Sequence, residues 1–356
     1  MDKNHFFAVS LLEWATAISR PLAWKGEKNP YFIWLSEVLL QQTRAEQGRP
    51  YYERFIKAFP KIEDLAAAAE DQVFKLWEGL GYYNRARNLH FTAKYVVEKY
   101  NGIFPNTYEE IRQLKGVGDY TAAAIASFAF DLPRAVLDGN VYRVLSRFFG
   151  IKIAIDSNEG KKEFAKLAQK LLADNAPAAY NQAIMDFGAV HCKPKNPLCA
   201  TCLHNTKCEA FAQKLQAILP IKSKKIKHKE RYFYYVIYRF EDKILLNKRE
   251  EKDIWQGLYD FPLLELAYLE QKENLIENAD FQQFINKNKS IKSISEPYYQ
   301  QLTHQKIIAF FIEIELKNKT ELDNKNWKWI ENEQLKDYAN PKIITNYLEN
   351  QHLSLF

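Results

Sequence analysis

Two carboxylates lie in settings that could give them different protonation states. Glu37 belongs to the helical pattern YFIWLSEVLLQQT, and the residues three and four positions away are largely apolar (Ile33, Trp34, Leu40 and Gln41). An acid held on such a stripe loses hydration, which raises its pKa and keeps it protonated near neutrality. That property suits a general acid. The alternative is a glutamate at the edge of the stripe, solvated or paired with an arginine.

The second carboxylate, Asp138, stands in the short polar break Asp138-Gly139-Asn140. It follows LKGVGDYTAAAIASFAF, in which a tight turn, Gly116-Val117-Gly118, joins two helical patterns. A helix that begins directly after such a turn presents free backbone N–H groups, which attract phosphate. The stretch could therefore hold a nucleic-acid backbone beside a reactive carboxylate. The alternative is an ordinary turn between core helices followed by a capping aspartate.

The four cysteines of the chain, Cys192, Cys199, Cys202 and Cys208, have the spacing C-x6-C-x2-C-x5-C. In a reducing compartment such a cluster indicates a metal site. Four thiolates without a carboxylate suit zinc or an iron–sulfur cluster. Zinc modules usually pair two short C-x2-C units and this chain has one, so the spacing favours a [4Fe–4S] cluster. Two disulfides are the alternative.

Length and composition fit a two-domain globular protein with a moderately basic surface. The chain has 356 residues, of which 47% are hydrophobic, and a formal net charge of +6. That charge permits a polyanionic partner without requiring one. No apolar run is long enough to span a bilayer, and the N-terminus lacks the pattern of a secretory signal. We expect a soluble, intracellular protein.

The chain before the cysteines has helical patterns almost throughout. Asn29-Pro30 is typical of a helix cap followed by a first-turn proline. Further helices are predicted at residues 50–59, 71–78, 84–100 and 161–173, and another after Asn140. The loop GLGYYNRARN lies between the second and third of these, and its tyrosines and arginines suit stacking on bases and pairing with phosphates. No strand pattern appears before about residue 231.

The composition changes near residue 218. The stretch ILPIKSKKIKHKER concentrates lysine and arginine, which predicts an exposed linker that could contact nucleic acid. Strand-like runs follow: YFYYVIYRF, KILLNKR and KIIAFFIEIEL. Helical patterns lie near residues 263–287 and 331–337. These features predict a second domain of the α+β type.

Together these residues resemble the helix–hairpin–helix DNA glycosylase superfamily. LKGVGDYTA resembles its hairpin, the aspartate of LDGN its catalytic carboxylate, and the cysteine spacing its iron–sulfur loop. WLSEVLLQQT, GLGYYNRARNLH and the C-terminal extension are similar to the adenine DNA glycosylase (MutY) family within it. That family removes adenine misincorporated opposite 8-oxoguanine. The resemblance covers nearly the whole chain and weakens after residue 265.

The resemblance implies an all-α catalytic domain over residues 1–215, a [4Fe–4S] loop at 192–208, a basic linker at 216–230 and a Nudix-like α+β domain at 231–356 that recognises 8-oxoguanine. The implied partner is double-stranded DNA in which adenine is mispaired with 8-oxoguanine or guanine. The protein would act as a monomer and would have no membrane partner. A cytoplasmic location at the nucleoid, as in bacteria, is expected on the same basis.

Four residues carry the implied chemistry. By resemblance, Glu37 is the general acid that protonates adenine N7, and Asp138 stabilises or adds to the oxocarbenium-like sugar. Tyr120 and Asn140 support this carboxylate. The endonuclease III branch has a lysine at the position of Tyr120, and a tyrosine cannot form a Schiff base. The resemblance therefore implies a monofunctional glycosylase.

Other implied residues would bind the DNA or the extruded base: Trp24, Leu40, Gln42, Tyr82, Gly116, Gly118, Gln182, Thr303 and His304. Gln182 stands where relatives have glutamate, and its amide can still bind the edge of adenine. The segment Gln301-Leu302-Thr303-His304 aligns with the family's Phe-Ser-His recognition loop, and Leu302 replaces the aromatic residue. The Nudix hydrolase signature is missing after Pro262, so we expect no nucleotide hydrolysis.

Overall fold

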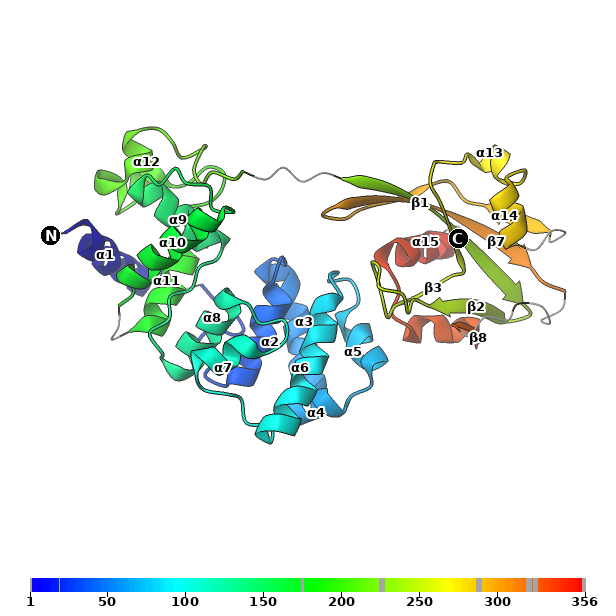
Figure 1. The fold of residues 1–356 in the computed structure, drawn as a ribbon, viewed down its shortest axis with the longest axis horizontal. Helices are drawn as coiled ribbons and strands as arrows, with labels where there is room; N and C mark the ends of the chain where they lie inside the picture. Colours follow the sequence, from blue (N-terminus) through cyan, green and yellow to red (C-terminus); the bar gives the residue numbers. More distant parts are fainter. Residues whose placement is uncertain are drawn as a thin grey trace. The chain divides into compact units, whose positions relative to one another are not determined.

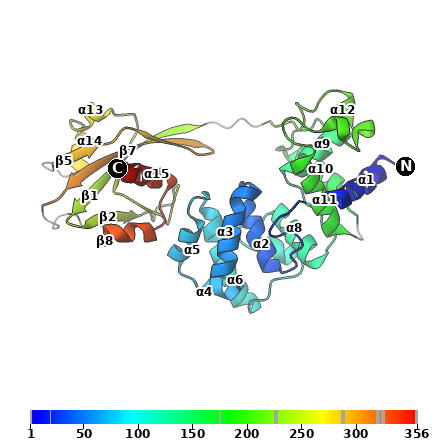
Figure 2. The ribbon, with the colours of Figure 1, turned by 180° about the vertical axis from the view of Figure 1, so that it is seen from behind.

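The computed structural model describes residues 2–18, 20–173, 176–223, 228–285, 290–317, 322 and 326–353. It contains two compact units, drawn in Figure 1 and, from behind, in Figure 2. The helical unit is Met1–Ala67 with Asn88–Lys224, and the sheet unit is Ala68–Arg87 with Lys225–Phe356. No helix within the described ranges is long and apolar enough to cross a membrane.

Helices build nearly all of the first unit. They are α1 (Lys3–Ala17), α2 (Pro30–Leu40), α3 (Ala45–Ala58), α4 (Ile62–Ala67), α6 (Asn84–Tyr100), α7 (Tyr108–Gln113), α8 (Asp119–Phe130), α9 (Gly139–Phe149), α10 (Asn158–Leu171), α11 (Pro177–Val190) and α12 (Glu209–Ala212), with 3-10 turns at Cys199–Thr201 and Asn205–Lys207. The first residues of α6 belong to the segment counted with the sheet unit.

The predicted start of α2 is confirmed. The Asn29 side chain accepts a hydrogen bond of 3.0 Å from the Tyr31 N–H, and Pro30 occupies the first helical position. By contrast, α3 begins at Ala45 rather than at the predicted residue 50. Pro50 lies inside this helix, beyond its first turn, and has no N–H to donate to the carbonyl of Glu46. The helix predicted at 84–100 has those bounds.

The predicted turn between two helices is also confirmed and forms the hairpin α7–turn–α8. Gly116 has φ +81°, and a Cβ there would lie 2.8 Å from the Cβ of Asn88. Gly118 precedes the first residue of α8, and Val117 is buried between the helices. Glycine at 116 therefore provides both the left-handed conformation and the close approach.

One buried core of the helical unit lies around α9 and α11. Phe7, Val144, Phe148, Phe164 and Phe187 belong to one buried cluster to which α1, α9, α10 and α11 contribute. Because one face of α9 is buried in this cluster, the position of the polar break Asp138-Gly139-Asn140 at the start of α9 is fixed. The helix start at residue 139 is thereby held in place against α11.

An eight-stranded mixed sheet forms most of the second unit. Its path is β3-β2-β1-β7-β5, and β4 pairs with β1, β6 with β7 and β8 with β2. The parallel pair β1–β7 has Tyr232 opposite Ile308. The strands are β1 (Lys229–Phe240), β2 (Lys243–Lys248), β3 (Tyr259–Asp260), β4 (Leu263–Leu266), β5 (Ile291–Ile294), β6 (Tyr298–Gln301), β7 (Gln305–Glu315) and β8 (Trp327–Glu331).

Both faces of this sheet are covered. Alternate residues of β1 enter two separate buried clusters, with Tyr235 in the cluster of α15 (Lys342–Leu353) and Tyr234 in that of α13 (Lys272–Leu275) and α14 (Ala279–Phe284). Helices on both faces explain why the predicted strands are apolar almost without alternation. The segment Ala68–Arg87, which contains α5 (Glu70–Trp77), joins this unit through Asp71, whose carboxylate accepts hydrogen bonds from Lys248 and Tyr259.

Two predictions for this unit need correction. The pattern at 263–287 is not wholly helical, because Leu263–Leu266 forms β4 and pairs with β1. The basic stretch at 218–231 is also not all linker: β1 begins at Lys229, and the largely buried Arg231 bonds Asp253 and Glu265. Lys224, Lys225 and Lys227 lie outside the described residues. The 3-10 helix at Asn332–Asp337 lies where the second helical pattern was predicted.

Candidate active site

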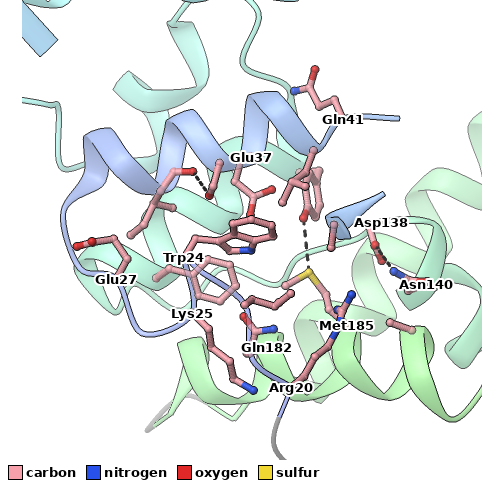
Figure 3. A pocket seen from close by; sticks show the side chains of 18 of the residues that line it. Arg20, Trp24, Lys25, Glu27, Glu37, Gln41, Asp138, Asn140, Gln182 and Met185 are labelled. Atoms are coloured by element: carbon pink, nitrogen blue, oxygen red, sulfur yellow. Dashed lines mark hydrogen bonds between the residues drawn. The ribbon is translucent and has the colours of Figure 1, made fainter. Parts of the chain in front are cut away.

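A cavity of about 990 Å³ opens in the helical unit (Figure 3). Its walls come from the chain before α2, from α2 and the segment that joins it to α3, and from α8, α9 and α11. The structure brings together eight of the residues predicted for the site: Trp24, Glu37, Leu40, Gln42, Tyr120, Asp138, Asn140 and Gln182. A site assembled from segments so far apart in sequence is the usual arrangement for binding a small organic group.

Glu37 projects into this cavity from the middle of α2 (Figure 3). Its neighbours on the helix, including Ile33 and Trp34, are buried, and Glu37 is itself only 7% exposed. The pKa of Glu37 is raised to about 7, mainly by burial. A hydrogen bond from Tyr120 lowers the pKa in part, and the charge of Asp138 adds to the rise. The burial of Glu37 is the cause that the apolar stripe predicted for a raised pKa.

This raised pKa makes a prediction about stability. Between pH 4.5 and about 7 the folded state retains a proton on Glu37 that the unfolded state has released, so folding becomes less favourable as the pH rises. The full effect is roughly 3 kcal/mol. Glu37→Gln, which stays neutral, is therefore expected to exceed the wild-type protein in stability at pH 8 by about that amount and to match it more closely at pH 5.

Hydrogen exchange of the α2 amides at the two pH values would measure this difference in the free energy of opening. Glu53→Gln makes the same chemical change at an exposed position of α3 and serves as the control. Parallel pH dependences for the wild-type protein and Glu37→Gln would contradict the proposed burial of an ionisable Glu37.

Asp138 is both a helix cap and a residue of the cavity wall, so the two interpretations of the sequence are compatible. Its carboxylate accepts hydrogen bonds from the Val141 N–H (2.7 Å) and from the Asn140 side-chain amide (2.8 Å). Burial raises the pKa of Asp138, while these two donors oppose the rise. The sequence placed this carboxylate in a polar break; in the structure the break is part of the cavity wall, and the resulting desolvation is what raises the pKa of Asp138.

Two uncharged side chains accompany the carboxylates. Burial and the charge of Glu37 raise the pKa of Tyr120 well above its ordinary value, so its hydroxyl remains a donor; it lies 3.5 Å from the Met185 sulfur. The Asn140 side-chain oxygen accepts a 2.8 Å hydrogen bond from Arg143. A Cβ on Gly188 would lie 2.6 Å from that of Asn140, so the glycine allows α11 to approach.

Sequence reasoning missed several residues around the site. The buried Arg143 links Asn140 to the carbonyls of Gly188 (2.7 Å) and Cys192 (2.8 Å), and so connects the start of α9 with the cysteine loop. Its signal was present: Arg143 and Arg147 stand four residues apart on one face of a helix whose neighbours are apolar. Arg20, Met185 and Asp186 had no comparable local signal.

The remaining predicted residues lie elsewhere. Gly116 and Gly118 form the α7–α8 turn, outside the lining of this cavity in the described structure. In the sheet unit, Thr303 and His304 lie at the tip of the β6–β7 hairpin, where the Leu302 N–H bonds the Gln305 carbonyl at 2.8 Å. The Tyr82 hydroxyl hydrogen bonds that of Thr303. The structure thus brings Tyr82 and Thr303 together.

The four cysteines occupy one loop between α11 and α12 and line a common apolar cavity. Burial raises the pKa of Cys202 to about 11 and also raises that of Cys208. Arg147 holds the loop by donating to the carbonyls of Lys193 (2.7 Å) and Pro194 (3.1 Å). Within the described residues no three His, Cys, Asp or Glu side chains are arranged to hold a single metal ion.

The donor set of this loop nevertheless fits a cationic cluster. Four thiols share one cavity without a carboxylate, and thiolates in apolar surroundings need a compensating positive centre. The Arg147 guanidinium lies 3.5 Å from the Cys192 sulfur, and the Gln216 amide lies 4.0 Å from that of Cys199. Such donors to ligand sulfurs are typical of the surroundings of iron–sulfur clusters.

Known proteins are similar to this chain over both units. Residues 35–173 match the family model described as HhH-GPD superfamily base excision DNA repair protein, and residues 233–350 match that of the NUDIX domain. A solved thermostable thymine-DNA glycosylase is 30% identical, with a TM-score of 0.56, over 59% of this chain and 97% of its own. A non-covalent endonuclease III–DNA complex shows the same fold at 23% identity and a TM-score of 0.53, over 61% of this chain and 99% of its own.

The similarity extends along the full chain in a curated relative. Adenine DNA glycosylase of Buchnera aphidicola subsp. Baizongia pistaciae (strain Bp) is 36% identical over 353 residues, which cover 95% of this chain and 96% of that protein. The predicted superfamily and the two-part architecture, a helical glycosylase domain followed by a Nudix-like domain, are confirmed. The chain therefore belongs to the adenine DNA glycosylase family of base-excision-repair enzymes.

Proposed function

We propose that this protein hydrolyses the N-glycosidic bond of adenine mispaired with 8-oxoguanine or guanine in double-stranded DNA, and leaves the backbone uncut. One observation carries the proposal: Glu37, with its pKa raised to about 7, and the helix-capping Asp138 line the same cavity. A base stacked in a duplex cannot reach such a cavity, so the adenine nucleotide must be extruded into it.

In the proposed reaction the two carboxyl groups act in sequence. Protonated Glu37 gives its proton to adenine N7, and the C1′–N9 bond breaks with its electron pair leaving on a neutral adenine. The carboxylate of Asp138 stabilises the resulting oxocarbenium-like sugar or adds to C1′ for a time. Glu37, now ionised, takes a proton from the water that attacks C1′, and where Asp138 has added, its bond to C1′ breaks and the carboxylate leaves. Tyr120 and Asn140 hold the two carboxyl groups in position by hydrogen bonds.

Binding of the DNA would use several parts of the chain. Trp24, Leu40 and Gln182 line the proposed adenine pocket, Gln42 wedges into the duplex beside it, and Gly116 and Gly118 present backbone N–H groups to phosphate. From the sheet unit, Tyr82 would wedge into the duplex around the mispair, and Thr303 and His304 would contact 8-oxoguanine. The hydroxyl contact between Tyr82 and Thr303 supports their assignment to one recognition surface.

We also propose that Cys192, Cys199, Cys202 and Cys208 hold a [4Fe–4S] cluster, which when bound would tie the loop into a fixed shape. Purified protein is expected to be brown, to absorb near ~400 nm and to carry about four irons per chain, because four thiolates hold a cubane cluster. Iron analysis and the absorption spectrum measure this. A colourless protein with one tightly bound zinc would contradict it.

The proposed activity is tested in a single-turnover incubation with a duplex that contains one adenine opposite 8-oxoguanine. Adenine release, with strand breaks appearing only after alkali, is the expected result. Strand breaks without alkali would instead indicate a lyase, which Tyr120 in place of a lysine argues against. Binding without release would indicate a module that recognises DNA without chemistry. We also propose that the enzyme is a monomer and that it acts in the cytoplasm.

A further inference from the structure

Asp186 is a buried carboxylate with no part in the chemistry proposed above. Its side chain is 5% exposed and lies on α11, four residues after Gln182. It pairs with two cations at once: Arg20 Nη1 at 3.1 Å and Lys25 Nζ at 3.0 Å. These are the only side-chain partners of Arg20 and Lys25 in the described ranges.

Both cations line the large cavity, and Figure 3 shows them on the wall that also carries Gln182 and Met185. Arg20 is 25% exposed and Lys25 34% exposed, so neither is enclosed by protein. Arginine has five N–H donors and lysine three, and Asp186 uses one of each. One negative charge against two positive charges leaves this group of three side chains with a net positive charge and with free donors.

A second ion pair at the same cavity shows how unusual this arrangement is. Lys28 also lines the cavity and pairs with Asp131 at 3.0 Å, but their side chains are 58% and 62% exposed. An exposed pair of this kind contributes little to position or stability. A buried carboxylate is costly to desolvate and fixes its partners in one geometry, so the Asp186 arrangement restricts Arg20 and Lys25 far more.

The charge of this wall indicates what it binds. A cation beside the adenine ring would oppose protonation of N7, and one beside C1′ would oppose the oxocarbenium-like sugar. Beside the phosphates that flank an extruded nucleotide a cation is favourable, because phosphates are anions that arginine and lysine bind by charge-assisted hydrogen bonds. The phosphates of the adenine strand are therefore the ligand that suits these cations.

We propose that Asp186 is a positioning residue that holds Arg20 and Lys25 as a clamp for the phosphates flanking the extruded adenine nucleotide. The inference rests on the proposed function. The competing role is structural only: Asp186 would tie the chain before α2 onto α11 and have no effect on the DNA. The two roles differ in what they do to the selectivity and salt dependence of DNA binding.

The test measures the affinity for two duplexes: one with a non-hydrolysable adenine nucleotide opposite 8-oxoguanine, and one without a mispair. In Asp186→Asn the ratio of the two affinities is expected to fall about tenfold, the loss of roughly one charge-assisted hydrogen bond. The salt dependence of the mispair complex should become shallower by about one phosphate contact. Lys25→Ala should lower the ratio similarly, and adding Asp186→Asn to it should lower the ratio by less than Asp186→Asn does in the wild-type protein, because only Arg20 then remains to be released.

Asp186→Glu, which keeps the charge, should restore much of the ratio. Asp131→Asn removes an aspartate that pairs with another lysine of the same cavity and should leave the ratio unchanged, because that pair is exposed. If Asp186→Asn lowers only the melting temperature, with the ratio and the salt dependence intact, the clamp is wrong and the proposed function stands. If the wild-type protein itself shows a ratio of one, the proposed function fails and the clamp with it.

Discussion

The Glu37→Gln variant is expected to release adenine at least about a hundred times more slowly than the wild-type protein in a single turnover, because general acid catalysis typically contributes that much or more. Glutamine has nearly the shape of protonated glutamic acid and can keep a hydrogen bond to Tyr120, but it has no proton to give to N7. The affinity for a duplex with a non-hydrolysable adenine nucleotide should therefore change little. A rate near that of the wild-type protein would remove Glu37 from the proposed role.

The pH dependence of the same reaction is expected to follow the carboxyl group. Because the pKa of Glu37 is about 7 and the proposed active form is protonated, the single-turnover rate of the wild-type protein should fall as the pH rises through that value. The residual rate of Glu37→Gln should lack this decline. A wild-type rate that stays constant between pH 6 and 9 would mean that another group supplies the proton.

Glu37 could be singled out from sequence because its signal is local. An acid among apolar residues three and four positions away is surrounded by the same residues in any packed helix, so the apolar stripe alone predicts a raised pKa. The glycine turn, the Asn29 cap and the cysteine spacing are equally local, and the structure has the turn and the cap where they were predicted.

The pairing of Asp186 with Arg20 and Lys25 could not be predicted in this way. The partners are separated by 166 and 161 positions in sequence, and only the packing of α11 against the chain before α2 brings them together. Arg143 illustrates an intermediate case. Its position on an apolar face indicated burial, but its three contacts with Asn140, Gly188 and Cys192 depend on the approach of α11 to α9.

The sheet unit shows the same limit for secondary structure. Leu263–Leu266 is a short apolar run that a helical and an extended pattern share, and its pairing with Tyr232–Tyr235 decides in favour of a strand. The long runs of β1 and β7 needed no such help, because β-branched and aromatic residues fill them. Tertiary pairing therefore determined the structure only where the local preference was weak.

Asp138→Asn is expected to reduce adenine release by on the order of 10²–10³ or more, because it removes the negative charge that we propose stabilises the developing cation. The fold should be almost unaffected. An asparagine oxygen can accept the hydrogen bond from the Val141 N–H that now measures 2.7 Å, and asparagine is as good a helix cap as aspartate. Binding of a duplex with a non-hydrolysable adenine nucleotide and the melting temperature should both stay near the wild-type values.

Asp138→Ala separates the two roles of this residue, since alanine loses the charge and the cap together. It should match Asp138→Asn in rate but lose about 1 kcal/mol of stability, the typical contribution of a helix cap. A measured rate and a thermal unfolding curve for both variants distinguish the outcomes. If Asp138→Asn keeps its activity while Asp138→Ala loses both activity and stability, Asp138 acts only as the cap of α9, and the cation must be stabilised by another group in the cavity.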